Sequence, residues 1–116
     1  MTAPVIFDAS EADFDRRVIQ SSFTYPVLID FWAAWCPPCL VLTPVLEDVV
    51  RNDPRGVHLA KIEADENMRL AGRYQVRGFP TVILLQHGEE RGRFSGARSS
   101  SMVRAFLDQH LLKGAA

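Results

Sequence analysis

The chemistry open to this sequence centres on its two cysteines, Cys36 and Cys39, which have Pro37 and Pro38 between them. On the first turn of a helix, side chains three positions apart share one face, with their Cβ atoms roughly 5 to 6 Å apart. A modest adjustment brings such a pair to the roughly 4 Å that a disulfide requires. The spacing therefore favours a bond that opens and closes without moving the fold.

The two thiols should differ in reactivity. Cys36 lies at or just before the expected helix start, where unpaired backbone N–H groups and the positive end of the helix dipole stabilise an anion. It should be the more acidic thiol and the attacking nucleophile. Cys39 lies one turn further along and should be more buried. It would resolve a mixed disulfide by attacking the Cys36 sulfur.

Two other interpretations of the cysteine pair remain open. A zinc site usually needs four protein ligands, or three and a water molecule. The histidines that could complete one have no ligand spacing to the pair: His58, His87 and His110. The cysteines could also be inert core residues, although Trp35 and the double proline beside them make poor packing partners. Redox chemistry fits the pattern better than either.

Hydrophobic spacing predicts which elements hold the pair. Residues 27–33 form an apolar run interrupted only by Asp30, which is typical of a strand buried on both faces of a parallel sheet. Residues 38–50 then repeat with the period of one helical face, through Leu42, Val45, Leu46 and Val49. Pro44 should kink this helix without ending it. The pair therefore lies where a buried strand ends and a helix begins.

Two charged residues lie in strands that otherwise look apolar. A buried carboxyl at Asp30, beneath Cys39, would have a pKa raised by desolvation and could take and return the Cys39 proton. Lys61, in the segment VHLAKI, would be its natural partner. The alternatives are that Asp30 is exposed at a strand end and that Lys61 occupies a solvated strand position.

The remaining elements alternate between strands and helices. We expect strands at residues 5–7, 26–33, 57–62, 81–85 and 90–95. The helices follow Ser10, the cysteine pair, an Asp65 cap and the serines at 99–101. Three strand–helix alternations predict right-handed parallel crossovers, and the last two strands form an antiparallel hairpin. The expected fold class is α/β, with a mixed sheet between helices in one domain over residues 1–116.

Length and composition narrow the functional classes. With 116 residues, 47% of them hydrophobic, the chain can bury a core of its own, and a net charge of -1 gives no electrostatic support for nucleic-acid binding. The first residues lack a secretory pattern, and no segment reaches the roughly 18 to 20 apolar residues of a membrane span. We therefore expect a cytoplasmic protein, in which a C-x-x-C pair is more often catalytic or metal-binding than structural.

The segment VLIDFWAAWCPPC resembles the thioredoxin family, and the resemblance runs along the whole chain. It implies the thioredoxin fold, a three-layer α/β/α arrangement with a central mixed five-stranded sheet and four helices. By motif, Asp30 is similar to the family's buried aspartate and Lys61 to the lysine near it. The resemblance thus implies a catalytic set of Cys36, Cys39, Asp30 and Lys61.

The segment Arg77–Thr81 resembles the family's R-G-x-P-T turn, whose proline is cis and lies against the disulfide. The backbone beside such a proline can pair with an extended substrate strand. The resemblance therefore implies an apolar substrate-binding rim around Cys36, with Ala64 and Ala97 beside it: Trp35, Pro37, Pro38, Phe79, Pro80 and Gly96.

Two positions depart from the usual C-G-P-C motif of the family. Pro37 replaces a glycine and removes an N–H that could point at the Cys36 sulfur. Leu40 stands where thioredoxins often have a lysine or arginine, so a nearby cation is lost. Both departures predict that Cys36 titrates higher than in a C-G-P-C-K relative.

The resemblance implies a monomeric enzyme that reduces protein disulfides and is itself reduced by an NADPH-dependent flavoprotein, thioredoxin reductase. It implies no metal and no cofactor other than the redox-active disulfide. Two alternatives remain open. One is a specialised oxidoreductase or isomerase with a dedicated partner, and the other is a binding or chaperone-like module that uses the apolar rim.

Overall fold

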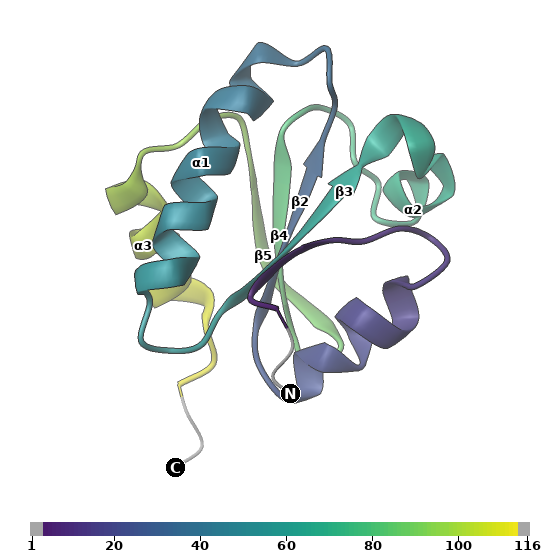
Figure 1. The fold of residues 1–116 in the computed structure, drawn as a ribbon. Helices are drawn as coiled ribbons and strands as arrows, with labels where there is room; N and C mark the ends of the chain where they lie inside the picture. Colours follow the sequence, from purple (N-terminus) through teal and green to yellow (C-terminus); the bar gives the residue numbers. More distant parts are fainter. Residues whose placement is uncertain (1–3, 114–116) are drawn as a thin grey trace.

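A computed structural model of the protein describes residues 4–113, which form one five-stranded sheet with helices packed against it (Figure 1). The strands lie in the order β1-β3-β2-β4-β5, so the strand that precedes the cysteines is central. Their bounds are β1 Ile6–Asp8, β2 Val27–Trp32, β3 His58–Glu63, β4 Thr81–Gln86 and β5 Glu89–Ser95.

The sheet combines both strand directions. β3 pairs in parallel with β1 and β2, while β2 pairs antiparallel with β4, and β4 antiparallel with β5. The expected mixed sheet with a C-terminal antiparallel hairpin is confirmed. The expectation of a third parallel crossover is wrong. The intervening helix α2 (Met68–Arg73) has six residues and spans about 9 Å, too little to return the chain along a strand of about 20 Å.

Helical segments cover both faces of the sheet, which confirms the expected three layers (Figure 1). On one face lie α1 (Pro37–Asn52) and α3 (Ser100–His110). On the other lie α2 and the short segments η1 (Asp15–Ile19), η2 (Ser21–Phe23) and η3 (Ala64–Glu66). Neighbouring residues of β2 serve different cores, since Leu28 packs under α1 and Ile29 packs on the opposite side.

The first helical region differs from the single helix that we expected after Ser10. It consists of the π-helical turn η1 followed by the 3-10 turn η2. The Ser10 N–H donates to Asp13 Oδ1 at 2.8 Å, so the acidic side chain supplies a hydrogen-bond partner for a backbone N–H just before η1. Phe14 and Val18, the expected inner face, are buried as predicted.

The helix after the cysteines follows its sequence pattern. Leu42, Leu46 and Val49 of α1 are buried and Val45 is half-buried, and the helix continues past Pro44 to Asn52. At the C-terminus, Ser99 caps α3 by accepting the N–H of Met102. Within residues 4–113, no helix has the length and hydropathy that crossing a membrane would require.

Candidate active site

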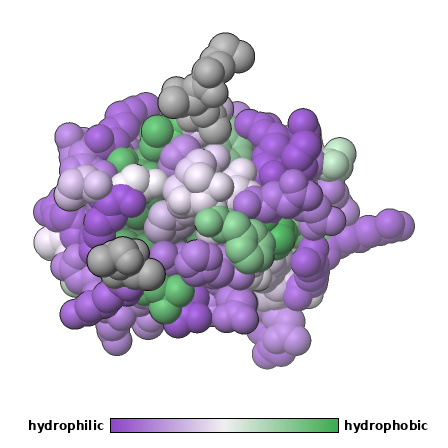
Figure 2. All heavy atoms as spheres, turned by 90° about the horizontal axis from the view of Figure 1, so that it is seen from below, coloured by the Kyte–Doolittle hydropathy of each residue, from purple (hydrophilic) through white to green (hydrophobic). Residues whose placement is uncertain are grey.

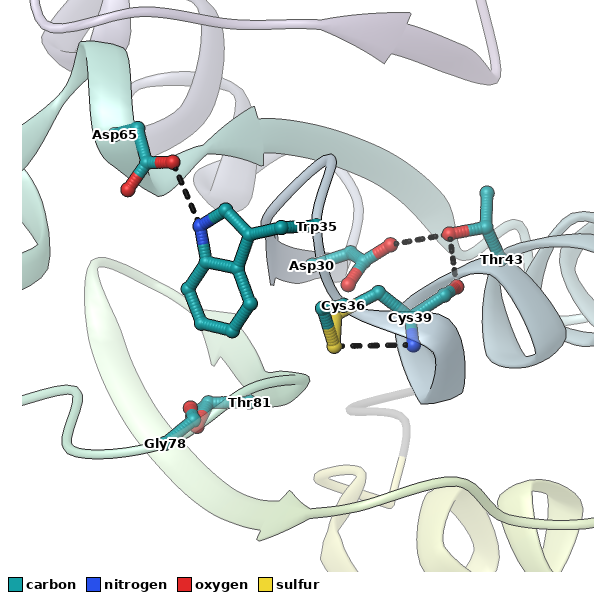
Figure 3. Close-up of a disulfide and its surroundings, with 8 residues drawn as sticks. All are labelled: Asp30, Trp35, Cys36, Cys39, Thr43, Asp65, Gly78 and Thr81. Atoms are coloured by element: carbon teal, nitrogen blue, oxygen red, sulfur yellow. Dashed lines mark hydrogen bonds between the residues drawn. A yellow bond between two sulfur atoms is a disulfide. The ribbon is translucent and has the colours of Figure 1, made fainter.

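The cysteine pair lies where α1 begins. Cys36 is the N-cap of the helix, and its Sγ accepts the N–H of Cys39 at 3.3 Å. Pro37 and Pro38 occupy the first two helical positions and have no N–H, so Cys39 carries the first one in the helix. The two cysteines form a disulfide with their Cα atoms 5.3 Å apart (Figure 3).

Both cysteines are almost fully buried in the disulfide form, with Cys36 exposed to 3% and Cys39 to 1%. Cys39 is the more buried of the two, as expected from the sequence, but the difference in exposed fraction is small. Their positions in the helix do separate them, because Cys36 accepts a backbone N–H as the cap while Cys39 belongs to the first turn. The dipole argument for an anionic sulfur accordingly applies to Cys36.

A turn distant in sequence packs against the pair. The Phe79–Pro80 peptide bond is cis, as the resemblance implied, and Phe79 packs in the small cluster formed by Ala33, Cys36 and Cys39. The Thr81 hydroxyl donates to the carbonyl of Gly78 at 2.6 Å and closes the turn (Figure 3). Gly96 N–H donates to the carbonyl of Pro80 at 2.9 Å, which ties the end of β5 to the same place.

The surface next to the cysteines carries exposed apolar side chains. Trp35 is 64% exposed and meets Phe79 edge to face, with ring centroids 5.7 Å apart. The indole is oriented by its Nε1–H, which donates to Asp65 at 2.9 Å. We had expected Asp65 to cap α2, but the N-cap of that helix is Asn67. Ala64 is buried, so its expected place in the rim is also wrong.

The rim continues onto the outer side of α1. Pro37 and Pro38 are exposed there, and so are Leu40 and Val41 in the next turn, to 60% and 63%. Figure 2 shows the molecule from below the view of Figure 1, that is, the face at the end opposite the start of α1. This face is mainly hydrophilic, with a few separate hydrophobic groups. At the cysteine end, by contrast, the exposed apolar residues are close together in the chain.

Asp30 lies in the middle of β2 and is fully buried. Its Oδ2 accepts the hydroxyl of Thr43 at 3.1 Å, and within residues 4–113 its Oδ1 has no hydrogen-bond partner. Burial raises the pKa of Asp30 from 3.8 to about 6. The Thr43 hydrogen bond and the charge of Lys61 act to lower it, and the charge of Glu47 acts to raise it. The predicted buried carboxyl is confirmed, and the exposed alternative is excluded.

Lys61 is in register with Asp30 on the neighbouring strand, but its ammonium group lies elsewhere. Its Nζ donates to Glu47 Oε2 at 3.0 Å, and both side chains remain partly exposed. No ion pair joins Lys61 to Asp30 in the part of the chain that the structure describes. The predicted partner therefore acts on Asp30 through its charge, which lowers the pKa of the carboxyl, and not through a direct contact. A long lysine side chain can reach the surface from a buried strand, where its charge stays hydrated.

Comparison with known proteins agrees with this geometry. The family model for thioredoxin matches residues 5–109. Thioredoxin from Pseudomonas aeruginosa is 37% identical over 106 residues, covering 91% of this chain and 96% of that protein. Thioredoxin from Acidithiobacillus ferridurans is 38% identical, with the same coverage. Thioredoxin from Chlorobaculum thiosulfatiphilum is 33% identical over 90% of this chain and 95% of its own.

The chain belongs to the thioredoxin family. It is accordingly a disulfide oxidoreductase, with its cysteine pair at the family's spacing and in disulfide contact. Thioredoxins normally work without a bound cofactor. Among residues 4–113, no group of three or more His, Cys, Asp and Glu side chains could hold a metal ion.

Two residues of this thioredoxin site escaped the sequence analysis, Thr43 and Glu47. Both lie on the side of α1 that carries Cys39, because positions four apart share a helix face. Thr43 contacts the buried carboxyl of Asp30. Glu47 forms the ion pair with Lys61, the lysine that we had expected to be the partner of Asp30. The series Cys39, Thr43, Glu47 was therefore a usable signal, because polar residues recur at intervals of four after the second cysteine.

Proposed function

We propose that the protein reduces disulfide bonds in other proteins by dithiol–disulfide exchange, with Cys36 as the nucleophile and Cys39 as the resolving thiol. The observation that supports this best is the disulfide at the start of α1, with Cys36 as the cap and the buried carboxyl of Asp30 below. Here a sulfur anion is stabilised at the helix start, and a proton acceptor is held close to the second cysteine.

In the reduced protein, the Cys36 thiolate attacks one sulfur of the substrate disulfide. The substrate S–S bond breaks, a mixed disulfide forms at Cys36, and the other substrate sulfur leaves as a thiolate. Asp30 then takes the Cys39 proton. The Cys39 thiolate attacks the Cys36 sulfur, and the remaining substrate sulfur leaves. Two electrons have passed to the substrate, and the Cys36–Cys39 disulfide has formed.

Asp30 and Lys61 have different parts in this proposal. Asp30 is the proton acceptor, and its pKa of about 6 leaves it mostly ionised near neutral pH yet able to bind a proton. Lys61 acts through its charge, which favours the ionised carboxylate. Its ion pair with Glu47 fixes where that charge lies.

The substrate-binding surface is the apolar rim around Cys36. Its exposed anchors are Trp35, Pro37 and Pro38, and the turn of Phe79 and Pro80 supplies backbone against which an extended substrate segment can pair. Gly96 has φ +86°, a backbone conformation that favours glycine, and its N–H donates to the carbonyl of Pro80 in that turn. Disulfide-containing segments with apolar neighbours are the substrates that this surface suits.

The oligomeric state, the reductase and the cellular location that we propose follow from membership of the thioredoxin family. Residues 1–116 act as one domain and as a monomer, and a thioredoxin reductase with flavin and NADPH returns the electrons. The reducing cytoplasm is the proposed location, because the open dithiol is the active form there.

Insulin reduction tests the proposed function, with dithiothreitol as the electron source and precipitation of the freed chains as the signal. We expect the natural protein to accelerate precipitation and Cys36→Ser to give only the dithiothreitol background. Equal rates for the two proteins would overturn the proposal. Replacing dithiothreitol with NADPH and a bacterial thioredoxin reductase then tests the reductase.

The Pro37 position favours a second candidate, a specialised oxidoreductase or isomerase. Pro37 and Pro38 occupy the first two helical positions, and this Pro-Pro loop is where the site departs from the C-G-P-C motif of the family. The reduction potential of the cysteine pair decides between the candidates, measured by equilibration with glutathione buffers. A value near −270 mV, the order of magnitude of known thioredoxins, supports the reductant. A value above roughly −200 mV supports the second candidate.

A further inference from the structure

The hydroxyl of Thr43 lies between the buried carboxyl and the resolving cysteine. Its Oγ1 is 3.1 Å from Asp30 Oδ2 and 3.0 Å from the carbonyl oxygen of Cys39. Figure 3 shows the hydroxyl at the centre of these two contacts. A single side chain therefore joins the central strand to the backbone of the cysteine that must lose a proton.

Counting protons shows that the two contacts depend on the state of Asp30. A hydroxyl has one proton to donate, although it can also accept. The Cys39 carbonyl can only accept, and so can an ionised carboxylate. With Asp30 ionised, Thr43 can serve only one of its two neighbours. With Asp30 protonated, the carboxyl donates to Thr43 and Thr43 donates to Cys39, so both hydrogen bonds form.

We propose that Thr43 is a positioning residue that couples the protonation of Asp30 to the backbone of Cys39. Its hydroxyl proton points to Asp30 while the carboxylate is ionised, and turns to the Cys39 carbonyl once the carboxyl has gained a proton. The inference rests on the proposed function, in which Cys39 gives its proton to Asp30. It deepens that function by naming the group that holds the carboxylate ready to receive it.

Among the described residues, no other group near the Asp30 carboxyl donates a hydrogen bond to it. Lys61 on β3 and Glu47 on α1 bond to each other and affect Asp30 through charge alone. The residue in register on β4 is Val82, which is apolar. Within residues 4–113, Thr43 is the one hydrogen-bond donor to the Asp30 carboxyl. Without its hydroxyl, the ionised carboxylate would be buried with no hydrogen bond.

The direct test is the titration of Asp30 in the oxidised protein, followed by carbon-13 NMR of the carboxyl group. Thr43→Val removes the hydroxyl and keeps the branched shape, and Thr43→Ser keeps the hydroxyl as the matched control. We expect the Asp30 midpoint to rise by about one pH unit in Thr43→Val, because the bond from Thr43 to the ionised carboxylate is stronger than the neutral bonds of the protonated carboxyl and acts to lower the pKa. It should stay near the natural value in Thr43→Ser. Thr43→Ala tests the same loss if the valine variant does not fold.

A kinetic test follows the step that the carboxyl serves. An aromatic disulfide reagent that releases a coloured thiolate reacts first with Cys36. The second release then reports the attack of Cys39 and does not depend on reagent concentration. In Thr43→Val, the pH midpoint of this second phase should rise by the same amount of about one pH unit. In an Asp30→Asn background, adding Thr43→Val should change the second phase no further.

An unchanged Asp30 midpoint in Thr43→Val would overturn the proposal. So would an equal shift in Thr43→Ser, or an additional shift of the second phase in the Asp30→Asn background. The NMR titration needs no turnover. It therefore decides the role of Thr43 even if the insulin assay overturns the proposed function.

Discussion

The helices α1 and α3 begin with the same cap geometry but different chemistry. In α1 the Sγ of Cys36 accepts the N–H of Cys39 at 3.3 Å, and in α3 the Oγ of Ser99 accepts the N–H of Met102 at 3.2 Å. Each cap therefore satisfies the N–H three positions further on, which an N-cap side chain normally does. A capping side chain stabilises a helix end whether or not it can react.

The differences lie around the cap. The residue that donates to the cap is a second thiol, 1% exposed, in α1, but a half-exposed methionine in α3. Two prolines follow Cys36, whereas two serines that keep their N–H groups follow Ser99. A buried carboxyl accompanies only the α1 start. The α1 start therefore differs from the α3 start by a second sulfur and a buried acid, which are the two groups that the proposed mechanism uses.

The largest effect should come from giving α1 the cap of α3. Cys36→Ser keeps an oxygen acceptor for the Cys39 N–H and removes the nucleophile, so disulfide reduction should fall to background. The free energy of unfolding should stay within about 0.5 kcal/mol of the reduced natural protein, because the cap is retained. Urea unfolding under reducing conditions measures this. A much larger loss of stability would show that the two caps are not interchangeable.

The next largest effect should come from Asp30, the buried acid beside the start of α1, which has no counterpart at the start of α3. The folded protein raises the pKa of Asp30 from 3.8 to about 6, so the folded state binds this proton more tightly. The stabilising contribution is complete below pH 3.8 and is lost as the pH rises through about 6. A difference of about two pH units corresponds to about 3 kcal/mol. Asp30→Asn should therefore gain about 3 kcal/mol relative to the natural protein between about pH 3.5 and pH 7.5.

Urea unfolding at several pH values measures this gain. Asp48→Asn is the matched control, since it removes an exposed carboxyl from α1. The stability difference between the control and the natural protein should stay nearly constant over the same pH range. A constant difference for Asp30→Asn as well would mean that burial of the carboxyl has no thermodynamic cost.

A smaller effect should follow from returning donors to the α1 start. In Pro37→Gly/Leu40→Lys, the first helical position regains an N–H and a cation stands one turn away. Both stabilise the thiolate, so the pKa of Cys36 should fall by up to about one pH unit. Thiolate absorbance against pH measures it in the reduced protein. An unchanged or higher value in the double variant would contradict the expected effect of the prolines.

The smallest effect belongs to the α3 cap. Ser99→Ala removes the acceptor for the Met102 N–H and should lower the free energy of unfolding by about 1 kcal/mol. The rate of insulin reduction should not change, because α3 contributes no residue to the proposed site. Ser100→Ala, at the first position of the same helix, serves as the control for a lost serine, because its hydroxyl makes no hydrogen bond within residues 4–113, whereas Ser101 contacts the Ser99 hydroxyl. A large loss of activity in Ser99→Ala would connect α3 to the chemistry.

Features that depend on neighbours in sequence could be predicted well. The apolar run into the cysteines predicted a central buried strand, and the spacing after them predicted a helix with Leu42, Leu46 and Val49 inside. The burial of Asp30 followed from its place in that run. Local spacing fixes which face of an element a residue occupies, and burial follows from the face.

The contacts made by the charged ends of flexible side chains were predicted poorly. Lys61 is opposite Asp30 in register, yet its ammonium group bonds to Glu47. Asp65 looked like a helix cap and instead orients Trp35. In both cases the backbone position was close to the expectation, but a flexible side chain has several partners within reach.

The sequence alone determined the reaction class, because two thiols at helical spacing after a buried strand with one acid leave few other chemistries. Only the tertiary structure decided which groups surround that acid. Thr43, Glu47 and Lys61 come from different elements, and their distances to Asp30 depend on how α1 packs across β2 and β3. The direction of β4 was decided in the same way, by a helix too short to cross the sheet. Contacts between separate elements arise from packing, which no local period in a sequence encodes.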